Sequence, residues 1–370
     1  MNYYIIAGEA SGDLHGSNLM KALQKEDVNA QFRFWGGDLM QAVGGTLVKH
    51  YKERAFMGFI EVIMNLSSIF KDIALCKKDI ASFKPDVIIF IDNSGFNLRI
   101  AKWAKQAGFK TNYYISPQVW ASRAKRVKDI KRDIDAMFVI LPFVEDFYKK
   151  YNYQVTFVGH PLIDAIANRP LVDDYEFRKN YLLNDQPIIA LLPGSRKQEI
   201  KNMLSVMLSL IDDFKDYQFV IAGAPSQEYS FYQPFIKSNN VKFISNKTYD
   251  LLSVSTAALV TSGTATLETA LFKVPQVVCY KGSNISYQIA KRIITLKFIS
   301  LVNLVMDREV VTELIQNNFN KKRLKEELYK ILDEKHRTKL FLDYYELEKV
   351  LGGKGASEKT AKLIYKSLQA

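Results

Sequence analysis

Short apolar runs rich in β-branched and aromatic residues recur along the chain, and helical patterns or turns separate them. Several runs are continuously apolar instead of alternating between apolar and polar residues, which is typical of strands buried on both faces of a parallel sheet. The alternation of such strands with helices predicts an α/β, doubly wound architecture. The runs form two series, which read YYIIAG, FRFWGG, DVIIFID, TNYYIS, MFVILPF and TFVGHP, then IIALLPG, YQFVIAGA, VKFIS, AALVTSG and QVVCYKG.

The two series predict two domains, because 370 residues exceed what one ordinary hydrophobic core supports. Residues 168–186 lie between the series and are polar, charged and poor in strand signal, so we interpret them as a connection. We expect one Rossmann-like domain over residues 1–167 and a second over residues 187–345. Ligands of open α/β sheets bind at the carboxyl ends of the strands, so the two domains are expected to face a central cleft there.

The charge and the cysteines narrow the classes of partner and compartment. A formal net charge of +12 suits phosphorylated ligands, an anionic membrane surface or nucleic acid, but no nucleic-acid-binding module accompanies it. We therefore expect no nucleic-acid partner. The two cysteines, Cys76 and Cys279, stand outside any disulfide or zinc pattern, which fits a reducing compartment.

No stretch has the pattern of a membrane span or a signal peptide. The longest charge-free run, residues 251–267, is rich in Ser and Thr and suits a strand, a turn and the start of a helix. The segment AFMGFIEVIMNLSSIF (residues 55–70) is apolar on more than one face but too short to cross a bilayer. It suits a core helix or, alternatively, an apolar surface for acyl chains or membrane lipid.

The stretch LLPGSRKQEI (residues 191–200) has the order strand, glycine turn, helix. Gly194 allows a tight turn, the first N–H groups of the helix favour an anion, and Arg196 adds a cation suited to phosphate. The turn predicts a phosphate site, with a plain strand–helix turn as the alternative. The helix is predicted from apolar residues spaced to form one buried face, namely Ile200, Met203, Leu204, Met207, Leu208 and Ile211.

The stretch TSGTATLE (residues 261–268) repeats this order. Gly263 makes the turn, and Thr264 and Thr266 offer hydroxyl and N–H groups at a helix start. Glu268 is misplaced for a capping box, because the residue three positions before it is an alanine. A carboxylate beside a diphosphate is tolerated if it points at hydroxyl groups, and a ribose supplies two. The alternative is an acid placed favourably at a helix N-terminus.

Three carboxylates follow buried strands in the first series. Asp92 ends the run DVIIFID, where it suits a general base or a helix cap. Glu9 and Asp13 lie in AGEASGDLHG, whose glycines are spaced by four and do not spell a dinucleotide fingerprint. With two better phosphate turns in the second series, these acids are expected to face sugar hydroxyls, and the glycines let the backbone approach a substrate.

A basic stretch and a histidine complete the candidates. Arg123 and Arg126 belong to a run of positive charge that could hold ligand phosphates or lipid headgroups, or could be a solvated face. His160 in VGHPL follows a strand and suits either a structural or a catalytic role. Together with Arg123 and Arg126 it is assigned to the acceptor or a lipid headgroup. The acids of DID (residues 133–135) match a metal-binding spelling but precede a strand instead of following one, so we expect no metal there.

Together these stretches resemble the lipid-A-disaccharide synthase family of inverting GT-B glycosyltransferases, whose fold is two Rossmann-like domains. The resemblance runs in family order from residue 3 to about residue 316. Its carriers are AGEASGDLHG, GFIEV, FNLRIAK, SPQVWASRAKRV, ILPFVEDFY, VGHPL, LLPGSRKQEI, SGTATLE and SLVNLVMDREVVTELIQ.

The resemblance implies that UDP-2,3-diacylglucosamine donates its sugar to 2,3-diacylglucosamine 1-phosphate, giving a tetraacyl disaccharide 1-phosphate and UDP in lipid A biosynthesis. It implies no metal and no cofactor, and a place at the cytoplasmic face of the bacterial inner membrane. Ser11 and Asn303 are assigned to the UDP pocket. The final helix, residues 346–370, is expected to return to an N-terminal domain, either within one chain or across a homodimer.

One departure from the family affects the choice of base. The family commonly reads I-D-x-P-D-F-N where this chain reads IDNSGFN, so Gly95 replaces the second acid and Ser94 replaces the proline. A base assigned to that acid cannot be carried over. Asp92 is therefore the first candidate, with Glu9 and Asp13 in reserve.

Two other functions stay open at this point. Another UDP-sugar enzyme of the same fold, such as a 2-epimerase or a different lipid glycosyltransferase, would keep the phosphate turns without the acyl-accommodating segment. A peripheral membrane-binding protein without enzymatic activity would use the basic stretch and the apolar segment. Its lipid binding would be unaffected by UDP and by Arg196→Ala.

Overall fold

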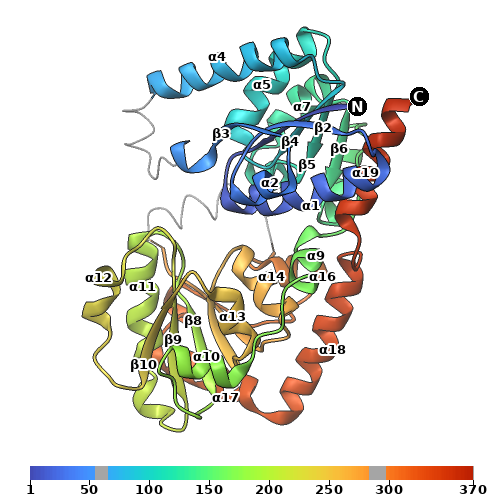
Figure 1. Cartoon of the computed structure of the whole chain (residues 1–370). Helices are drawn as coiled ribbons and strands as arrows, with labels where there is room; N and C mark the ends of the chain where they lie inside the picture. Colours follow the sequence, from blue (N-terminus) through green and yellow to red (C-terminus); the bar gives the residue numbers. More distant parts are fainter. Residues whose placement is uncertain (55–65, 283–296, 370) are drawn as a thin grey trace. The chain divides into compact units, whose positions relative to one another are not determined.

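The computed structural model describes residues 1–54, 66–282 and 297–369, and it divides the chain into two compact units (Figure 1). The first unit comprises Met1–Asn168 and Leu351–Ala370, and the second comprises Arg169–Val350. The stretch suggested as a connection thus belongs to the second unit from Arg169 onward. Most of the apolar segment 55–70 lies outside the described residues.

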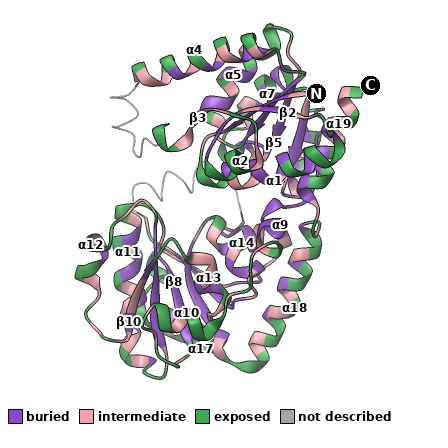
Figure 2. Cartoon of the chain, viewed as in Figure 1, coloured by how far each residue is buried: buried purple, intermediate pink, exposed green. Residues whose placement is uncertain are grey.

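The first unit contains a seven-stranded parallel sheet in the order β3-β2-β1-β4-β5-β6-β7. Its central strands are buried on both faces, which accounts for their continuously apolar sequences (Figure 2). The strands are β1 (Asn2–Ala7), β2 (Gln31–Gly36), β3 (Thr46–His50), β4 (Val87–Ile91), β5 (Thr111–Tyr114), β6 (Ala136–Val139) and β7 (Thr156–Phe157).

Helices cover both faces of this sheet. Tyr3 and Ile5 of β1 point into a core shared with α1 and α19, whereas Tyr4 donates a hydrogen bond of 2.8 Å to Asp79 of α4 on the opposite face. The helices of this unit are α1 (Ala10–Glu26), α2 (Asp38–Val43), α4 (Leu66–Phe83), α5 (Ser94–Gln106), α6 (Val119–Ser122), α7 (Val127–Asp133), α8 (Phe143–Lys149), α9 (Pro161–Ala167) and α19 (Ala356–Gln369).

The last helix is held in the first unit by packing and by a carboxylate. Helix α19 lies along α1 (Figure 1), with Ala361 and Ile364 buried in the core under β1. The Asp164 side chain of α9 accepts hydrogen bonds from the backbone N–H groups of Gly355 and Ser357, at 2.7 and 3.2 Å. These bonds satisfy donors at the start of α19 that have no partner within the helix.

The second unit contains a six-stranded parallel sheet in the order β10-β9-β8-β11-β12-β13. Its strands are β8 (Ile188–Leu192), β9 (Gln218–Gly223), β10 (Val241–Ser245), β11 (Ala257–Thr261), β12 (Gln276–Tyr280) and β13 (Glu313–Ile315). Its helices are α10 (Asp174–Asn180), α11 (Lys197–Leu208), α12 (Tyr229–Tyr232), α13 (Thr248–Ser253), α14 (Thr264–Leu271), α16 (Leu301–Met306), α17 (Lys321–Leu332) and α18 (Glu334–Val350).

The predicted α/β, doubly wound architecture is confirmed in both units. The amphipathic pattern in α11 buries Ile200, Met203, Leu204 and Met207, although the helix ends at Leu208 and does not reach Ile211. The sequence missed the edge strands β3 and β13. Their sequences, TLVKH and ELI, are too short or too polar for the continuous apolar pattern, because an edge strand has a neighbour on one side only.

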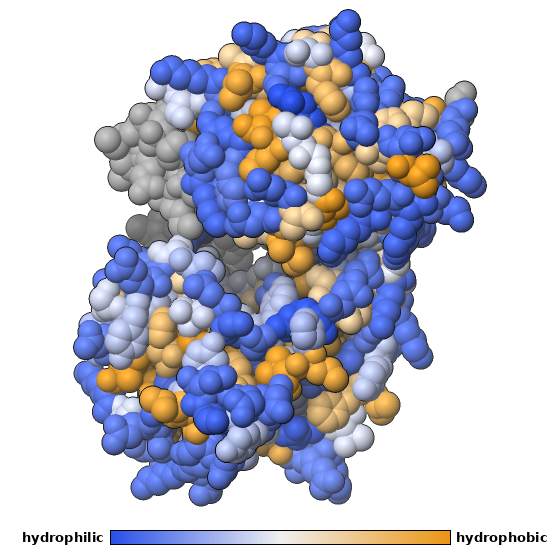
Figure 3. Space-filling model, in the orientation of Figure 1, coloured by the Kyte–Doolittle hydropathy of each residue, from blue (hydrophilic) through white to orange (hydrophobic). Residues whose placement is uncertain are grey.

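One face of the surface is shown by hydropathy in Figure 3. On the face shown in Figure 3, hydrophilic side chains predominate and apolar ones form small, separate groups. None of the helices within residues 1–54, 66–282 and 297–369 is long and apolar enough to cross a membrane.

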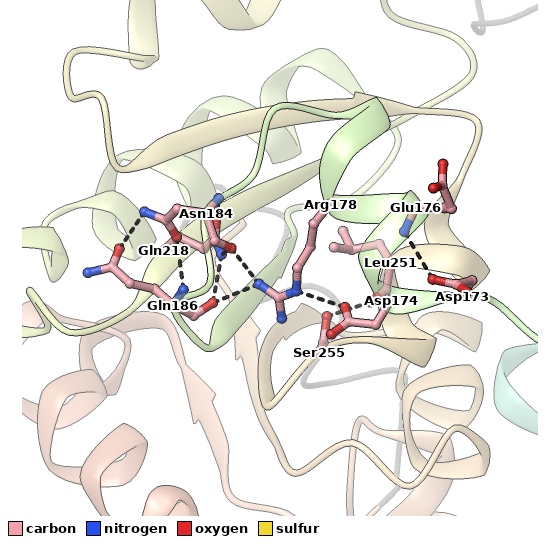
Figure 4. A network of polar contacts seen from close by, with 9 residues as sticks. All are labelled: Asp173, Asp174, Glu176, Arg178, Asn184, Gln186, Gln218, Leu251 and Ser255. Carbon is pink, nitrogen blue, oxygen red and sulfur yellow. Dashed lines mark hydrogen bonds and ion pairs between the residues drawn. The ribbon is translucent and has the colours of Figure 1, made fainter.

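A polar network secures the stretch before β8 to the second unit (Figure 4). Arg178 of α10 donates to the carbonyl oxygens of Asn184 and Gln186, at 2.6 and 3.0 Å, and to Asp174 at 2.8 Å. The buried Gln218 carboxamide donates to the same two carbonyl oxygens and accepts from the Asn184 N–H. This charged stretch is therefore folded onto β9.

Replacing Gln218 with Leu should lower the free energy of unfolding by about 1–3 kcal/mol, because the Asn184 N–H loses its acceptor and the carbonyl oxygens of Asn184 and Gln186 keep only Arg178 as donor. Urea unfolding of the purified chain measures the change. Gln24→Leu, at an exposed position of α1, is the control and should be nearly neutral. Equal stabilities for the two variants would contradict the assigned role of Gln218.

Candidate active site

The second unit has a cavity of about 420 Å³ at the carboxyl ends of its central strands. Three loops contribute to its lining, as expected for a ligand site in an open α/β sheet. They are the turn after β8 with Gly194, Ser195, Arg196 and Glu199, the end of β9 with Ala222–Pro225, and the turn after β11 with Thr261–Ala265 and Glu268.

The turn between β8 and α11 is held open by local contacts. Gly194 has φ +108°, and a Cβ there would collide with the Glu199 carboxylate. The Ser195 N–H donates to that carboxylate at 3.1 Å, and the Ser226 hydroxyl donates to the Ser195 carbonyl oxygen at 3.0 Å. Arg196 is exposed and has no partner among the described residues, so its guanidinium is available to an anion.

The turn between β11 and α14 exposes the second helix start to the cavity. Gly263 has φ +141° and leaves open space, and Thr264 lines the cavity beside it. The Thr261 hydroxyl, which sequence reasoning did not single out, is buried at the cavity wall without a hydrogen-bond partner. A buried hydroxyl of this kind suits a bound polar ligand. Thr266 is different, because its hydroxyl donates to Gly263 and accepts from Leu301 away from the cavity.

Glu268 combines burial with a single polar partner. The Tyr249 hydroxyl of α13 donates to Glu268 Oε1 at 2.8 Å. Burial raises the pKa of the Glu268 carboxyl, and the bond from Tyr249 opposes this rise. The carboxyl group also lines the cavity, so it can accept a hydrogen bond from a ligand hydroxyl.

Asn303 was expected in the nucleotide pocket, but it lies outside the cavity lining. Its carboxamide oxygen accepts from the N–H groups of Val310 and Val311, and its amide donates to the Val311 carbonyl oxygen and to Glu313. The side chain is fully buried and joins α16 to the loop before β13. Its side-chain hydrogen-bonding groups are thus used within the fold, and the expected place of Asn303 in the UDP pocket stays a prediction.

In the first unit, Asp92 follows β4 in a strained backbone conformation. Asp92 and Asn93 have φ +45° and +42°, a region that residues other than glycine seldom adopt. Two groups hold the Asp92 carbonyl oxygen in place, the Tyr113 hydroxyl and the Asn97 amide, the latter at 2.8 Å. The same Asn97 amide also reaches the carbonyl oxygen of Ile91 at 3.1 Å.

The Asp92 carboxyl has the electrostatic setting of a base. Surrounding protein removes much of the water around it although the residue keeps an exposed surface, and Glu9 adds a negative charge. Together these raise the pKa of Asp92 to about 6, with the loss of solvation as the larger cause. The loops that carry the two acids lie together, because Ala7 pairs with Ile91 and a Cβ at Gly8 would collide with Asn93.

The residues near Asp92 are exposed or face open space. Glu9 precedes α1 and is exposed, without a capping bond from its side chain, and Ser11 is exposed on the first turn of that helix. Gly95 faces open space, with no atom within 4 Å of a Cβ placed there. A larger residue would fit at this position without a clash.

Asp13 has three hydrogen bonds within the fold. Its buried carboxylate accepts from the backbone N–H groups of Gly37, Leu39 and Met40, at 2.8, 3.0 and 3.0 Å. These are the donors at the start of α2, which a six-residue helix cannot satisfy itself. Asp13 therefore holds α2 in position, and its place in reserve as a catalytic base stays a prediction.

His160 is likewise structural. It is buried at the start of α9, where its ring nitrogen Nδ1 accepts a hydrogen bond of 3.3 Å from the Leu162 N–H. Burial, with a smaller contribution from His15, lowers the pKa of His160 to about 3. The ring is neutral at ordinary pH, and the expected contact of His160 with the acceptor or a lipid headgroup stays a prediction.

The basic stretch and the DID motif differ in whether their charged side chains have partners. Arg123 is exposed and Arg126 half-buried, and neither has an ion-pair partner among the described residues. Asp133 pairs with Arg132 at 2.7 Å, and Asp135 accepts from the Thr111 N–H at 3.0 Å. Within the described parts of the chain, no group of His, Cys, Asp and Glu side chains could hold a metal ion.

Two units that each contain a parallel, doubly wound sheet have the architecture of the GT-B fold, which glycosyltransferases share with nucleotide-sugar epimerases. The solved UDP-GlcNAc 2-epimerase of Neisseria meningitidis, bound to UDP-GlcNAc, matches all of both chains with a TM-score of 0.65. At 13% identity this likeness establishes the fold alone.

The sequence comparison is more specific. Residues 3–365 match the model of the lipid-A-disaccharide synthetase family, and the chain belongs to that family. The lipid-A-disaccharide synthase of Geobacter metallireducens is 38% identical, over 98% of this chain and 96% of its own. That of Syntrophus aciditrophicus is 39% identical, over 96% and 95%. The chain is therefore an enzyme of the glycosyltransferase class.

His160→Asn should reduce the acid sensitivity of the fold. Above pH 6.5 His160 is neutral in both states and contributes nothing to the pH dependence. As the pH falls below 6.5, the unfolded chain takes up a proton that the folded chain binds only near pH 3, so the wild type loses stability. The loss is at most about 1.4 kcal/mol per pH unit.

Asparagine keeps the helix cap and does not titrate. The difference between the unfolding free energies of wild type and variant, measured by urea unfolding, should therefore shift in favour of the variant from pH 7 to pH 4.5. A difference that stays constant over this range would show that His160 is not buried in its neutral form.

Proposed function

We propose that this chain transfers the sugar of UDP-2,3-diacylglucosamine to 2,3-diacylglucosamine 1-phosphate, with inversion at the anomeric carbon and without a metal ion. The products are the tetraacyl disaccharide 1-phosphate and UDP, a step in lipid A biosynthesis. The observation that carries the proposal is the cavity of the second unit, where two helix starts and Arg196 converge on a space with the character of an anion site. Membership of the family supplies the sugar-lipid class of substrate.

On this proposal the second unit binds the UDP part of the donor. The diphosphate lies on the two turns, at Gly194 and Arg196 and at Gly263 and Thr264, where N–H groups and a guanidinium stabilise the charge that develops on the leaving UDP. Glu268 accepts a hydrogen bond from the ribose. The buried Thr261 hydroxyl, which lacks a protein partner, joins this set as a further contact.

Asp92 is proposed as the general base. It takes the proton from the attacking acceptor hydroxyl, whose oxygen forms a bond to the anomeric carbon as the bond from that carbon to the UDP oxygen breaks. A base with a pKa near 6 is ionised at neutral pH and still able to accept a proton, so the environment of Asp92 supports this role. Glu9 remains in reserve, and Ser11 beside it is proposed as a contact to the nucleotide-sugar.

Arg123 and Arg126 are proposed to bind the phosphate of the acceptor or of neighbouring lipid headgroups. Their side chains have no acidic partner among the described residues, so both charges are available. Since both substrates are diacylated, we place the enzyme at the cytoplasmic face of the inner membrane as a peripheral protein. The net charge of +12 suits an anionic lipid surface.

The direct test is product analysis with the two diacylated sugars. Wild type should form the disaccharide and UDP, and Asp92→Asn should lower kcat/KM by about 100-fold or more, the usual contribution of a general base. Asp86→Asn at the other end of the same strand is the matched control and should stay near wild type. Absence of disaccharide from the wild type would sink the proposed function, whereas full activity of Asp92→Asn would sink only the assignment of the base.

The pH profile tests the environment of the base. kcat/KM should rise with pH through about 6 and then level off, as Asp92 loses its proton. Glu9→Gln removes a negative charge that raises the pKa of Asp92, so the rising limb should move to lower pH. A limb at the same pH in wild type and variant would show that Glu9 does not act on the base.

A further inference from the structure

We propose that Tyr249 is a positioning residue for the ribose site, holding one oxygen of Glu268 so that the other selects nucleotides that carry ribose hydroxyls. Selection of this kind follows when a buried polar group is built to pair with a hydroxyl, since an analogue without that hydroxyl leaves the group unpaired. The inference rests on the proposed function, in which Glu268 faces the ribose of UDP.

The contact between the two side chains is direct and one-sided. Tyr249 is the second residue of α13, and its hydroxyl donates to Glu268 Oε1 at 2.8 Å. Glu268 Oε2 has no hydrogen bond to any residue that the structure describes. Because the residue lines the cavity beside Thr264 and Ala265, this second oxygen is left to accept from a ligand.

The Tyr249 ring is held from two sides. It packs against Phe272, with ring centroids 5.3 Å apart, and the Arg169 guanidinium lies 5.1 Å from the Tyr249 ring centre and 5.7 Å from that of Phe272. Arg169 is fixed in turn by an ion pair with Asp250, the residue after Tyr249. Glu268 and Phe272 are four residues apart in sequence, so they lie on the same side of α14, toward its C-terminal end.

The chemistry of this arrangement suits recognition of a hydroxyl group. A neutral phenol occupies one carboxylate oxygen and leaves the negative charge on Glu268, whereas an arginine in its place would pair with both oxygens. Arg169 stacks on the ring and pairs with Asp250, so it stiffens the donor without neutralising the carboxylate. The half-buried carboxylate therefore keeps one strong acceptor, aimed by a rigid partner.

Isothermal titration with UDP, 2′-deoxy-UDP and 3′-deoxy-UDP tests the inference on four proteins: wild type, Tyr249→Phe, Glu268→Gln and Tyr175→Phe. Wild type should bind UDP at least about tenfold more tightly than one of the deoxy analogues, the usual value of a hydrogen bond to a charged group. Tyr249→Phe keeps the ring and its packing. It should cut this ratio about fivefold or more, with the affinity for that deoxy analogue nearly unchanged. Glu268→Gln should also reduce the ratio.

The control variant changes an exposed tyrosine of α10 and should keep the wild-type ratio. A merely structural role for Tyr249 would lower the affinity for all three nucleotides alike and would overturn the inference. A wild type that binds UDP and both deoxy analogues equally well would also overturn it. If Tyr249→Phe does not fold, Glu268→Gln decides: a Glu268→Gln variant with the wild-type ratio of affinities would overturn the inference. A wild type that does not bind UDP at all would instead refute the proposed function.

Discussion

The burial of parallel strands on both faces is the constraint on which the rest of this structure depends. A strand such as β4 or β8, apolar at every position, needs helices above and below it, and a parallel strand needs a crossover helix to return the chain. The carboxyl ends of the strands then meet at one edge of each sheet. Glycine turns and helix starts gather at this edge, so the polar chemistry of each unit follows from the packing of its apolar core.

The carboxylates at these edges fall into two groups, according to whether hydrogen bonds within the fold occupy their oxygens. Asp13 accepts hydrogen bonds from the N–H groups at the start of α2, and Asp164 does the same for α19. Without these carboxylates, both helices would begin with unpaired donors. Asp92 and Glu268 keep acceptor capacity toward a ligand. Asp92 keeps it in a strained backbone, which Asn97 and Tyr113 hold by the carbonyl oxygen and thereby leave the carboxyl free.

The cavity of the second unit shows how a basic protein can place acids beside positive charge. Arg196 and the backbone N–H groups of two turns supply positive potential, while Glu268 lies beyond them with Tyr249 on one oxygen. The positive charges suit a diphosphate. Of the two acids that line the cavity, Glu199 accepts a hydrogen bond from the Ser195 N–H, and Glu268 suits a neutral sugar with hydroxyl groups. The same division explains why the acids near Asp92 do not conflict with a phosphorylated substrate, since they lie in a unit that does not carry these turns.

The sequence alone determined the doubly wound architecture, the two glycine turns at Gly194 and Gly263, and the placement of Arg196, Asp92 and Glu268 in the segments that follow strands. Each of these depends on residues that are close in sequence, because periodicity, glycine turns and helix starts are local properties. The tertiary structure decided which side chains remain available. The partners of Asp13 lie 24 to 27 residues away, and those of Asn303 lie across a loop, so no local pattern could show that their oxygens are occupied. Tyr249 could not be predicted from the sequence for the same reason, since only folding brings the Tyr249 hydroxyl of α13 to Glu268 of α14.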